Sequence, residues 1–576
     1  MSRYSQKADA LRARITHGIT YMDGGMGTQL QARGLGAGEL PELWNLNRPE
    51  DVTAIHRAYF AAGAHVVTTN TFGANALKYT GKDGKPGVAE IVRAGVACAM
   101  AARDTADTEM PDRPHFVALD IGPTGRLIAP MGDLDFEEAV ELFGEVARIG
   151  CESGADAIII ETMSDCAETR AAVLGAMENA DLPVFVTNAY EQNGRLLTGT
   201  SPEGMAALLG GMGVSAMGLN CSFGPDRMLP VVRRLAKTSS LPLLVSPNAG
   251  LPVTDAATGR TYYSVTPEEF AAGMVDIVLA GATLVGGCCG TTPDHIRALV
   301  AATEQLVDKL PARPAPSRSV LTSRTRVLAV ADDADVPLVV GECINPSGRP
   351  TLAQEIADGD TDEMLDLAMD QMDCGAQVLD INVAIGGEGE SARMKAAVCA
   401  VQSMVDLPLA FDSSNAKALE AGLRAYHGRG IINSLTGKQS SLDAVLPLAK
   451  KYGGMVVGLT MDEQGIPSTA QGRVDIAARI VAAAEAAGLC REELLIDPLV
   501  LPEYTAEDAT EVTLEAARRI RGELGVKVLL AVSNVSYGMR DRESINIEFL
   551  RRAMDGCVDA VMVNPLCDAV MELLEQ

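Results

Sequence analysis

The sequence predicts an α/β protein built from two (β/α)8 TIM barrels in tandem, joined by a Pro-rich linker. Short apolar runs rich in β-branched residues alternate with Ala-rich helical stretches along the 576 residues. This pattern is typical of repeated βα units around a parallel sheet. Eight such runs precede a single Pro-rich break and eight follow it. Because a barrel of this kind needs about 250 residues, the chain length fits two of them.

The first half contains the eight strands of the first predicted barrel. Helical patterns lie between them, for example over 137–151 and 202–211. Eight strands that alternate with helices close naturally into a barrel. The predicted strands are Thr20–Asp23, His65–Thr69, Phe116–Asp120, Ala157–Glu161, Val184–Asn188, Met217–Asn220, Leu243–Ser246 and Thr283–Gly286.

The pattern breaks between Pro311 and Ser319, where Pro and basic residues dominate and apolar residues are few. Such a composition indicates an exposed linker. We therefore expect a first domain at 1–310, a linker at 311–334 and a second domain at 335–576. The strands predicted for the second domain are Leu338–Gly341, Gln377–Ile381, Leu409–Asp412, Gly430–Asn433, Met455–Thr460, Leu494–Asp497, Val526–Ala531 and Ala560–Val563.

The charge balance excludes some classes of partner. The chain has 76 acidic and 48 basic residues and a net charge of −28. This argues against binding of nucleic acid or of an anionic membrane surface, because both depend on basic side chains. The segment Met1–Arg14 lacks the apolar core of a signal peptide, and no apolar run reaches the ~18 residues of a membrane span. We expect a cytoplasmic protein whose cysteines stay reduced.

Polar side chains follow the predicted strands in both halves. In a barrel these positions form the carboxyl rim, which is where active sites lie. Some of them are expected to cap helices instead, since Asp and Asn are also favoured there. The rim residues are Asp23, Asn70, Asp120, Glu161, Asn188, Asn220, Asn248, Glu342, Asp380, Asp412, Asn433, Asp462, Asp497, Asn534 and Asn564.

Three cysteines lie at strand ends of the first half and predict a metal site. Cys221 follows the sixth strand, and Cys288 and Cys289 follow the eighth. These strands are near neighbours in a barrel, and three thiolates suit Zn²⁺ while leaving its fourth position open for catalysis. The alternatives are small buried hydrophobic side chains or a vicinal disulfide. An open zinc–trithiolate site binds an incoming thiol as the nucleophilic thiolate, which favours alkyl transfer to sulfur over hydrolysis.

The first half resembles the homocysteine S-methyltransferase family over about residues 10–305. The matching motifs are Asp23-Gly-Gly-Met-Gly-Thr28, Thr69-Asn-Thr-Phe-Gly73, Glu161-Thr162, Gly218-Leu-Asn-Cys221 and Gly287-Cys-Cys-Gly-Thr291. The resemblance implies zinc held by Cys221, Cys288 and Cys289, with the homocysteine sulfur as the fourth ligand. It also implies that Asp23, Gly24, Gly25 and Glu161 hold the amino-acid end. Glu161 can neutralise the ammonium, and backbone N–H groups near Gly24 and Gly25 can receive the carboxylate.

Asn248 ends the seventh strand, between the strands that carry the cysteines. Three roles are open for it. It contacts the substrate, it occupies the open zinc position when substrate is absent, or it caps a helix.

The second half carries carboxylates and carboxamides at its strand ends in place of a three-residue metal cluster. Such groups hydrogen-bond a flat heterocycle rich in N–H donors, such as a pterin. From about residue 335 onward the chain resembles the pterin-binding family, in particular its methyltetrahydrofolate methyltransferase branch, through Asp412-Ser-Ser, Asn433-Ser and Ser533-Asn-Val-Ser536. The resemblance implies a pterin site in which Asn534 lies near the methyl-bearing N5. Its remaining residues are Glu342, Asn382, Asp412, Asn433 and Asp497.

Together the halves resemble the N-terminal part of cobalamin-dependent methionine synthases. This implies methyl transfer from 5-methyltetrahydrofolate to homocysteine through a cobalamin carrier. The family's Asp-x-His-x-x-Gly cobalamin signature is absent from this sequence, so we expect the corrinoid to be carried by another module or a separate corrinoid protein. One alternative is a homocysteine methyltransferase with a different methyl donor, whose second barrel serves a corrinoid protein. Another is a protein that binds folate and homocysteine without turnover.

Overall fold

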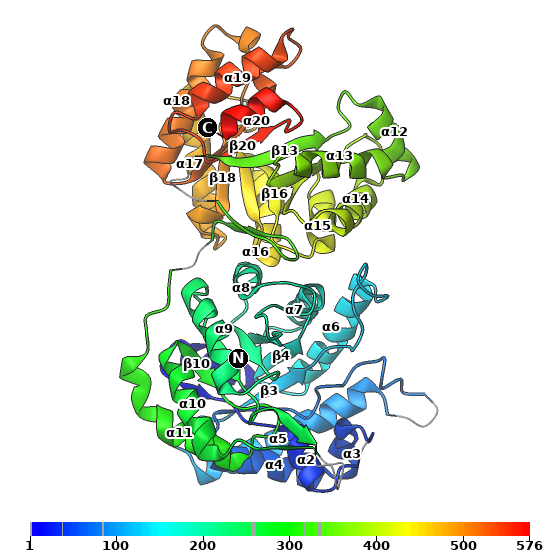
Figure 1. Cartoon of the computed structure of the whole chain (residues 1–576), viewed down its shortest axis with the longest axis vertical. Coiled ribbons are helices and arrows are strands. Elements are labelled where there is room, and N and C mark those ends of the chain that lie inside the picture. Colours follow the sequence, from blue (N-terminus) through cyan, green and yellow to red (C-terminus); the bar gives the residue numbers. More distant parts are fainter. Residues whose placement is uncertain are drawn as a thin grey trace. The chain divides into compact units, whose positions relative to one another are not determined.

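The computed structural model describes residues 3–36, 38–82, 86–254, 261–315, 318–330 and 336–575. The chain divides into two compact units near residue 316. Each unit contains one parallel eight-stranded sheet with helices in the connections (Figure 1). The prediction of two (β/α)8 barrels is therefore confirmed.

The first unit holds an eight-stranded parallel sheet in the order β1-β10-β7-β6-β5-β4-β3-β2. The remaining gap, between β1 and β2, is narrowed by a parallel bridge from Met22 to Val66. The His65 N–H also donates to the Tyr21 carbonyl oxygen at 2.7 Å, so the barrel is nearly closed. Its strands are β1 (Thr20–Tyr21), β2 (Val66–Thr68), β3 (Phe116–Ile121), β4 (Ala157–Met163), β5 (Val184–Asn188), β6 (Ala216–Asn220), β7 (Leu243–Ser246) and β10 (Ala282–Val285).

Helices connect these strands and cover the sheet. The predicted helices over 137–151 and 202–211 correspond to α6 and α8. The helices are α1 (Arg3–Arg14), α2 (Met26–Ala32), α3 (Trp44–Asn47), α4 (Pro49–Ala61), α5 (Val88–Glu109), α6 (Phe136–Glu152), α7 (Cys166–Asn179), α8 (Pro202–Met212), α9 (Pro225–Thr238), α10 (Pro267–Leu279) and α11 (Pro293–Thr303). A hairpin of β8 (Pro252–Thr254) and β9 (Thr261–Tyr263), which was not predicted, lies between β7 and α10.

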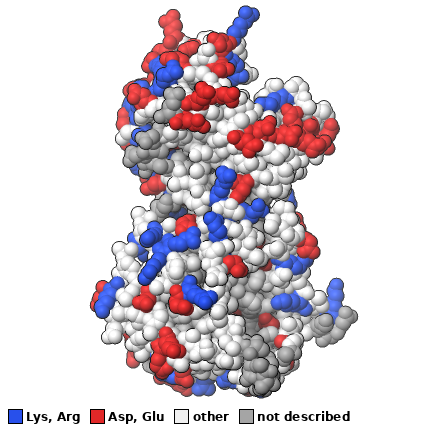
Figure 2. Space-filling model, viewed as in Figure 1, with Lys and Arg blue, Asp and Glu red and all other residues white. Residues whose placement is uncertain are grey.

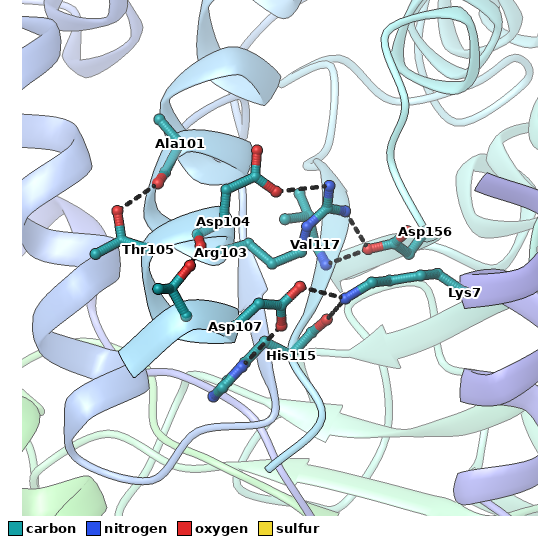
Figure 3. A network of polar contacts seen from close by, with 10 residues as sticks. Lys7, Ala101, Arg103, Asp104, Thr105, Asp107, His115, Val117 and Asp156 are labelled. Carbon is teal, nitrogen blue, oxygen red and sulfur yellow. Dashed lines mark hydrogen bonds and ion pairs between the residues drawn. The ribbon is translucent and has the colours of Figure 1, made fainter. Parts of the chain in front are cut away.

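Helix α1 closes the amino-terminal end of the first barrel. Its Leu11, together with Ile15 just after the helix, belongs to the same buried cluster as Val66 and Phe116, which begin β2 and β3. The ammonium of Lys7 on α1 donates to Asp107 Oδ2 at 2.8 Å and to the His115 carbonyl oxygen at 3.0 Å (Figure 3). These bonds fix α1 to α5 and to the start of β3, which leaves the opposite, carboxyl rim for a site.

The second unit is a closed parallel barrel in which β13 to β20 follow one another in order. Its strands are β13 (Leu338–Ile344), β14 (Val378–Asn382), β15 (Leu409–Asp412), β16 (Ile431–Thr436), β17 (Met455–Leu459), β18 (Leu494–Asp497), β19 (Lys527–Ala531) and β20 (Ala560–Val563). Its helices are α12 (Pro350–Asp358), α13 (Asp362–Asp373), α14 (Glu390–Met404), α15 (Ala416–Ala425), α16 (Gln439–Tyr452), α17 (Ala470–Ala486), α18 (Ala509–Leu524), α19 (Arg542–Ala553) and α20 (Asp568–Leu574).

An antiparallel hairpin closes the amino-terminal end of the second barrel. Its strands β11 (Val320–Thr322) and β12 (Val327–Ala329) lie within the segment predicted as a linker. Leu321 belongs to the buried cluster of the barrel interior. The buried guanidinium of Arg429 donates to the carbonyl oxygens of Arg318 at 2.6 Å and Val320 at 2.8 Å. It also pairs with Glu493 at 2.9 Å, so the hairpin is part of the second unit.

Charged side chains of both signs are scattered among uncharged residues on the face drawn in Figure 2. None of the described helices is both long and apolar enough to cross a membrane.

Candidate functional site

The three cysteines predicted as metal ligands meet at the carboxyl rim of the first barrel. Cys221 follows β6 directly, and Cys288 and Cys289 lie in the loop between β10 and α11. Their three sulfur atoms all lie within 4.8 Å of one another. Among the described residues, these cysteines form the one cluster of three or more His, Cys, Asp or Glu side chains that is close enough to hold a metal ion. Three sulfur atoms that bind the same Zn²⁺, each at about 2.3 Å, are separated from one another by distances comparable with these. The residues present therefore fit a trithiolate zinc site.

The backbone aims these side chains. Cys221 and Ser222 have φ values of +59° and +58°, in the left-handed region that non-glycine residues rarely adopt. Hydrogen bonds hold the two cysteine loops against the β7 end, from Cys221 N–H to the Ser246 carbonyl oxygen at 3.1 Å and from Cys288 N–H to that of Pro247 at 2.7 Å. Backbone strain of this kind persists only where the surrounding structure enforces it.

Hydrogen bonds among the three sulfur atoms shift the pKa values of these cysteines in opposite directions. The bonds with Cys288 and Cys289 lower the pKa of the Cys221 thiol, and the bond with Cys221 raises the pKa of Cys288. A thiolate is the form that binds a metal, so the cluster is electrostatically prepared for a cation.

Two asparagines support the cysteine loops. The Asn248 Oδ1 accepts a hydrogen bond from the Cys289 N–H at 3.0 Å. The strand β8 follows Asn248, so it begins no helix and the capping alternative does not hold. The Asn220 amide lies 3.8 Å from the Cys288 sulfur and donates to Thr162 Oγ1 at 2.8 Å. Asn220 thus links the Cys288 loop to the end of β4.

A cavity of about 240 Å³ adjoins the three cysteines, and predicted substrate-binding residues line it. Asp23, Gly24, Gly25 and Glu161 all contribute to its wall, as do the three cysteines. Asn248 is not among the residues that line it. This cavity therefore brings the three cysteines and the two predicted carboxylates together in one wall.

Asp23 is held in this wall by Thr68, whereas the Asn220 amide donates to Glu161 Oε2 at 3.5 Å. The Asp23 Oδ2 accepts the Thr68 N–H at 2.8 Å and its Oδ1 accepts the Thr68 hydroxyl at 3.2 Å. Burial raises the pKa of Asp23 to about 7 despite these bonds. Burial, and then the nearby charge of Asp23, raise the pKa of Glu161 to about 8. A cationic ligand group would offset both effects.

Gly24 and Gly25 are positions with no room for a side chain. A Cβ at Gly24 would lie 2.6 Å from Thr291 Oγ1, and one at Gly25 would lie 2.8 Å from the Cys288 carbonyl oxygen. The close approach explains this Gly-Gly pair. The Gly25 N–H donates to Thr291 Oγ1 at 3.1 Å, so this donor is already engaged inside the protein.

The second barrel has its own cavity at the carboxyl rim, of about 710 Å³. Five of the six residues predicted to bind folate line it, and Asn382 does not. Asn382 lies directly behind one of them, since its amide donates to Asp412 Oδ2 at 2.8 Å. The five lining residues are Glu342, Asp412, Asn433, Asp497 and Asn534.

Hydrogen bonds fix the polar groups of this cavity in pairs. The Asn433 amide donates to Asp380 Oδ1 at 3.0 Å, and the Ser533 hydroxyl donates to Glu342. Asp497 Oδ1 accepts the Leu499 N–H at 2.7 Å, and Leu499 has a φ of +68°. Burial raises the pKa of Asp497 to about 7. Paired and buried groups of this kind form a rigid polar surface for a flat ligand.

Several residues of the two cavities were not assigned to the sites from the sequence. Asp380 lies on the inward face of β14 beside Asn382, and its place two residues before Asn382 is the signal that could have found it. Thr68 ends β2 and Thr291 ends the Gly287–Thr291 motif, so their places at or after strand ends are the signal that could have found them. Glu42 comes from a segment without a strand-end motif, and only the folded chain brings it to the first cavity.

Comparisons with known proteins agree with this division. Residues 20–303 match the family model described as homocysteine S-methyltransferase. Residues 341–564 match the one described as pterin binding enzyme. The chain thus contains a homocysteine S-methyltransferase domain and a pterin-binding domain.

Curated relatives include the methionine synthases of Mycobacterium tuberculosis and Mycobacterium leprae. The first is 34% identical over 96% of this chain and the second 33% identical over 94%. The chain spans 48% and 47% of their lengths, so it covers about half of these relatives.

Solved structures similar to single barrels include two enzymes. The metallated form of an Escherichia coli homocysteine methyltransferase is 27% identical, with a TM-score of 0.42, and the match covers 51% of this chain and 99% of that one. A Xanthomonas albilineans dihydropteroate synthase in complex with 7,8-dihydropteroate is 22% identical, with a TM-score of 0.35, and the match covers 45% and 96%.

Proposed function

Because the chain joins a homocysteine S-methyltransferase domain to a pterin-binding domain, we propose that this enzyme transfers a methyl group from 5-methyltetrahydrofolate to homocysteine. The products are methionine and tetrahydrofolate. Methyl carriage between the two barrels is assigned to cobalamin, bound by another module or by a separate corrinoid protein.

The observation that carries the proposal is the composition of the first cavity. One wall supplies three cysteine sulfur atoms within 4.8 Å of one another, and the same cavity presents Asp23 and Glu161. A thiol with an ammonium group a few bonds away satisfies both features. Homocysteine is such a molecule.

The first barrel would bind homocysteine by its two ends. Cys221, Cys288 and Cys289 would hold Zn²⁺, which lowers the pKa of a bound thiol and so supplies the thiolate nucleophile. The Glu161 carboxylate would accept hydrogen bonds from the substrate ammonium. Asn248 would keep the Cys289 loop in place through its bond to the Cys289 N–H.

The second barrel would bind the pterin ring of the folate. The carboxylates of Asp412 and Asp497 can each accept two N–H donors of a pterin, and Asn433 is held ready by Asp380. Asn534, in the short 3-10 helix at Val532–Ser536 that follows β19, would lie near N5, where a hydrogen bond favours the protonated form that releases its methyl group more easily.

Homocysteine-dependent demethylation of added methylcobalamin tests the first half-reaction. The zinc-loaded chain is expected to produce methionine, and Cys221→Ser is expected to lose at least 99% of that rate because one metal ligand is gone. Cys374→Ser, which changes an exposed cysteine of the second barrel, is the matched control and should keep the full rate. A wild-type chain that binds zinc but produces no methionine would contradict the proposal.

A further inference from the structure

One carboxylate of the first cavity has no role in the chemistry described above. Asp120 lies near the end of β3 and is only 5% exposed. Among the described residues its Oδ1 atom has no hydrogen-bond partner. A buried carboxylate oxygen without a hydrogen-bond partner costs free energy. A bound ligand or a proton on this oxygen would remove that cost.

The strand geometry points this carboxylate into the cavity. Side chains alternate along a strand, and Phe116 and Ala118 of β3 lie in the barrel interior. Asp120 continues this inward row and lines the cavity together with Glu161 of the neighbouring strand β4. The two carboxylates therefore lie on adjacent strands, with Glu161 one inward-facing position beyond Ile159, the register partner of Asp120.

The main chain of Asp120 is fixed without help from its side chain. Its N–H donates to Thr69 Oγ1 at 3.0 Å, and its carbonyl oxygen accepts the Thr71 hydroxyl at 2.7 Å. These main-chain bonds hold the loop after β3 without a contribution from the Asp120 side chain.

Other carboxylates of the same cavity are already engaged. Both oxygens of Asp23 accept hydrogen bonds from Thr68. Glu42 accepts the Gly73 N–H at 2.6 Å and the Tyr79 hydroxyl at 2.8 Å. Asp120 Oδ1 is therefore an acceptor that the protein leaves open on this wall.

The electrostatics of the cavity favour a cation at this point. No Lys, Arg or His occurs among the described residues that line it. Burial, followed by the charges of Glu161, Asp23 and Glu42, raises the pKa of Asp120 well above its ordinary value. A positive group beside Asp120 and Glu161 would relieve this repulsion.

We propose that Asp120 is a second anchor for the α-ammonium of homocysteine, accepting one of its N–H donors at Oδ1 while Glu161 accepts another. The inference rests on the proposed function, because it assumes that the substrate sulfur lies at the three cysteines. It makes Asp120 a specificity residue that selects thiols with a free, protonated amine. An ammonium has three donors, so two carboxylate anchors can be served at once.

Equilibrium binding to the zinc-loaded full chain tests this role, with two thiols as probes. Homocysteine carries the α-ammonium, and 4-sulfanylbutanoate has hydrogen in its place. Loss of a hydrogen bond to a charged group weakens binding roughly 10- to 100-fold. Asp120→Asn is expected to weaken the binding of homocysteine by this factor. Its affinity for 4-sulfanylbutanoate should stay within about twofold of the wild-type value.

Two further variants make the result decisive. Asp120→Ala removes the side chain altogether and should show the same selective loss of homocysteine, in case the Asn amide forms a substitute bond. Asp226→Asn, which removes an exposed charge at the start of α9, is the control for long-range charge and should change neither affinity.

The outcomes distinguish the role of Asp120 from the proposed function. Equal weakening of both thiols, or no weakening of either, in the Asp120 variants would overturn the assignment of Asp120. A wild-type chain that binds zinc and neither thiol would instead overturn the proposed function itself.

Discussion

At the residue scale, the first cavity depends on a few side chains whose positions the backbone enforces. Cys221 adopts a left-handed conformation, and Cys288 is held by Asn220 and by its own N–H bond to the Pro247 carbonyl oxygen. Metal affinity should therefore be lost when any single sulfur atom is removed, because the other two cannot move to replace it.

Zinc content measures this directly. Protein purified without chelator is expected to contain about one zinc per chain, and Cys288→Ser to contain less than about a tenth, because three protein ligands are the minimum of an open zinc site. Elemental analysis of both proteins provides the number. Less than half a zinc per wild-type chain would contradict the assignment of the metal site.

Asp497 gives the second barrel a pH-dependent stability. Its pKa rises from the usual 3.8 to about 7 in the folded protein, so the folded state retains a proton that the unfolded state releases. The free energy of unfolding should therefore fall as the pH rises from about 4 to about 7, and stay level above that. Between pH 5 and pH 7 this amounts to about 2 kcal/mol.

Urea unfolding at pH 5 and pH 8 measures the effect. The side chain introduced by Asp497→Asn cannot ionise, so the difference in the free energy of unfolding between pH 5 and pH 8 should be about 3 kcal/mol smaller in this variant than in wild type. Asp366→Asn, at an exposed position of α13, should show the same difference as wild type. An identical pH dependence in wild type and Asp497→Asn would show that Asp497 ionises normally.

At the element scale, the sequence identified every barrel strand but missed the hairpins. Each predicted strand overlaps an observed one, because strands buried on both sides read as continuous apolar runs. The hairpin of β11 and β12 has three residues per strand, which is too short for a periodic signal. Its stability comes from the Leu321 contact with the barrel interior and from Arg429, which are tertiary features.

Some site residues could likewise be predicted from the local sequence, and others depend on tertiary contacts. Strand-end residues such as Glu161 and Asp412 could be predicted because a parallel barrel brings all strand ends to one rim. The engaged N–H of Gly25 and the place of Asn382 behind Asp412 could not, since hydrogen bonds between distant segments determine them.

Replacement of Arg429 should destabilise the second barrel at its amino-terminal end. Arg429→Met would leave Glu493, which is 5% exposed, without its closest cation. It would also remove the donors to the carbonyl oxygens of Arg318 and of Val320 in β11. The cost expected for breaking a buried ion pair is about 3–5 kcal/mol. Denaturant unfolding measures it.

A second variant separates charge from packing. Arg429→Met combined with Glu493→Gln removes the unpaired charge and should recover part of the lost stability. A single Arg429→Met variant within about 1 kcal/mol of wild type would show that Arg318, 3.6 Å from Glu493, suffices as the partner.

At the scale of the whole molecule, each compact unit holds one complete cavity built from its own strands. Variants in separate units without shared partners are expected to act additively. The two half-reactions should therefore be separable by substitution.

Asp412→Ala tests this separation. It is expected to abolish methyl transfer from methyltetrahydrofolate to cob(I)alamin, because the Asn382–Asp412 pair is lost, while homocysteine-dependent demethylation of methylcobalamin stays within twofold of wild type. Cys221→Ser should show the reverse pattern. Loss of both activities in either variant would mean that the two units are coupled.

The left-handed backbone at Cys221 and Ser222 also bears on metal exchange. Zinc fingers unfold without their metal because the metal organises the chain. Here the barrel organises the ligands, so a chelator should remove the ion while the circular dichroism spectrum stays unchanged. The emptied protein should then accept Co²⁺ or Cd²⁺ without refolding. The identity of the bound ion would then depend on which metal ions are available and on the preference of sulfur for soft cations. Because the site does not need the metal to fold, the ion could be exchanged after folding.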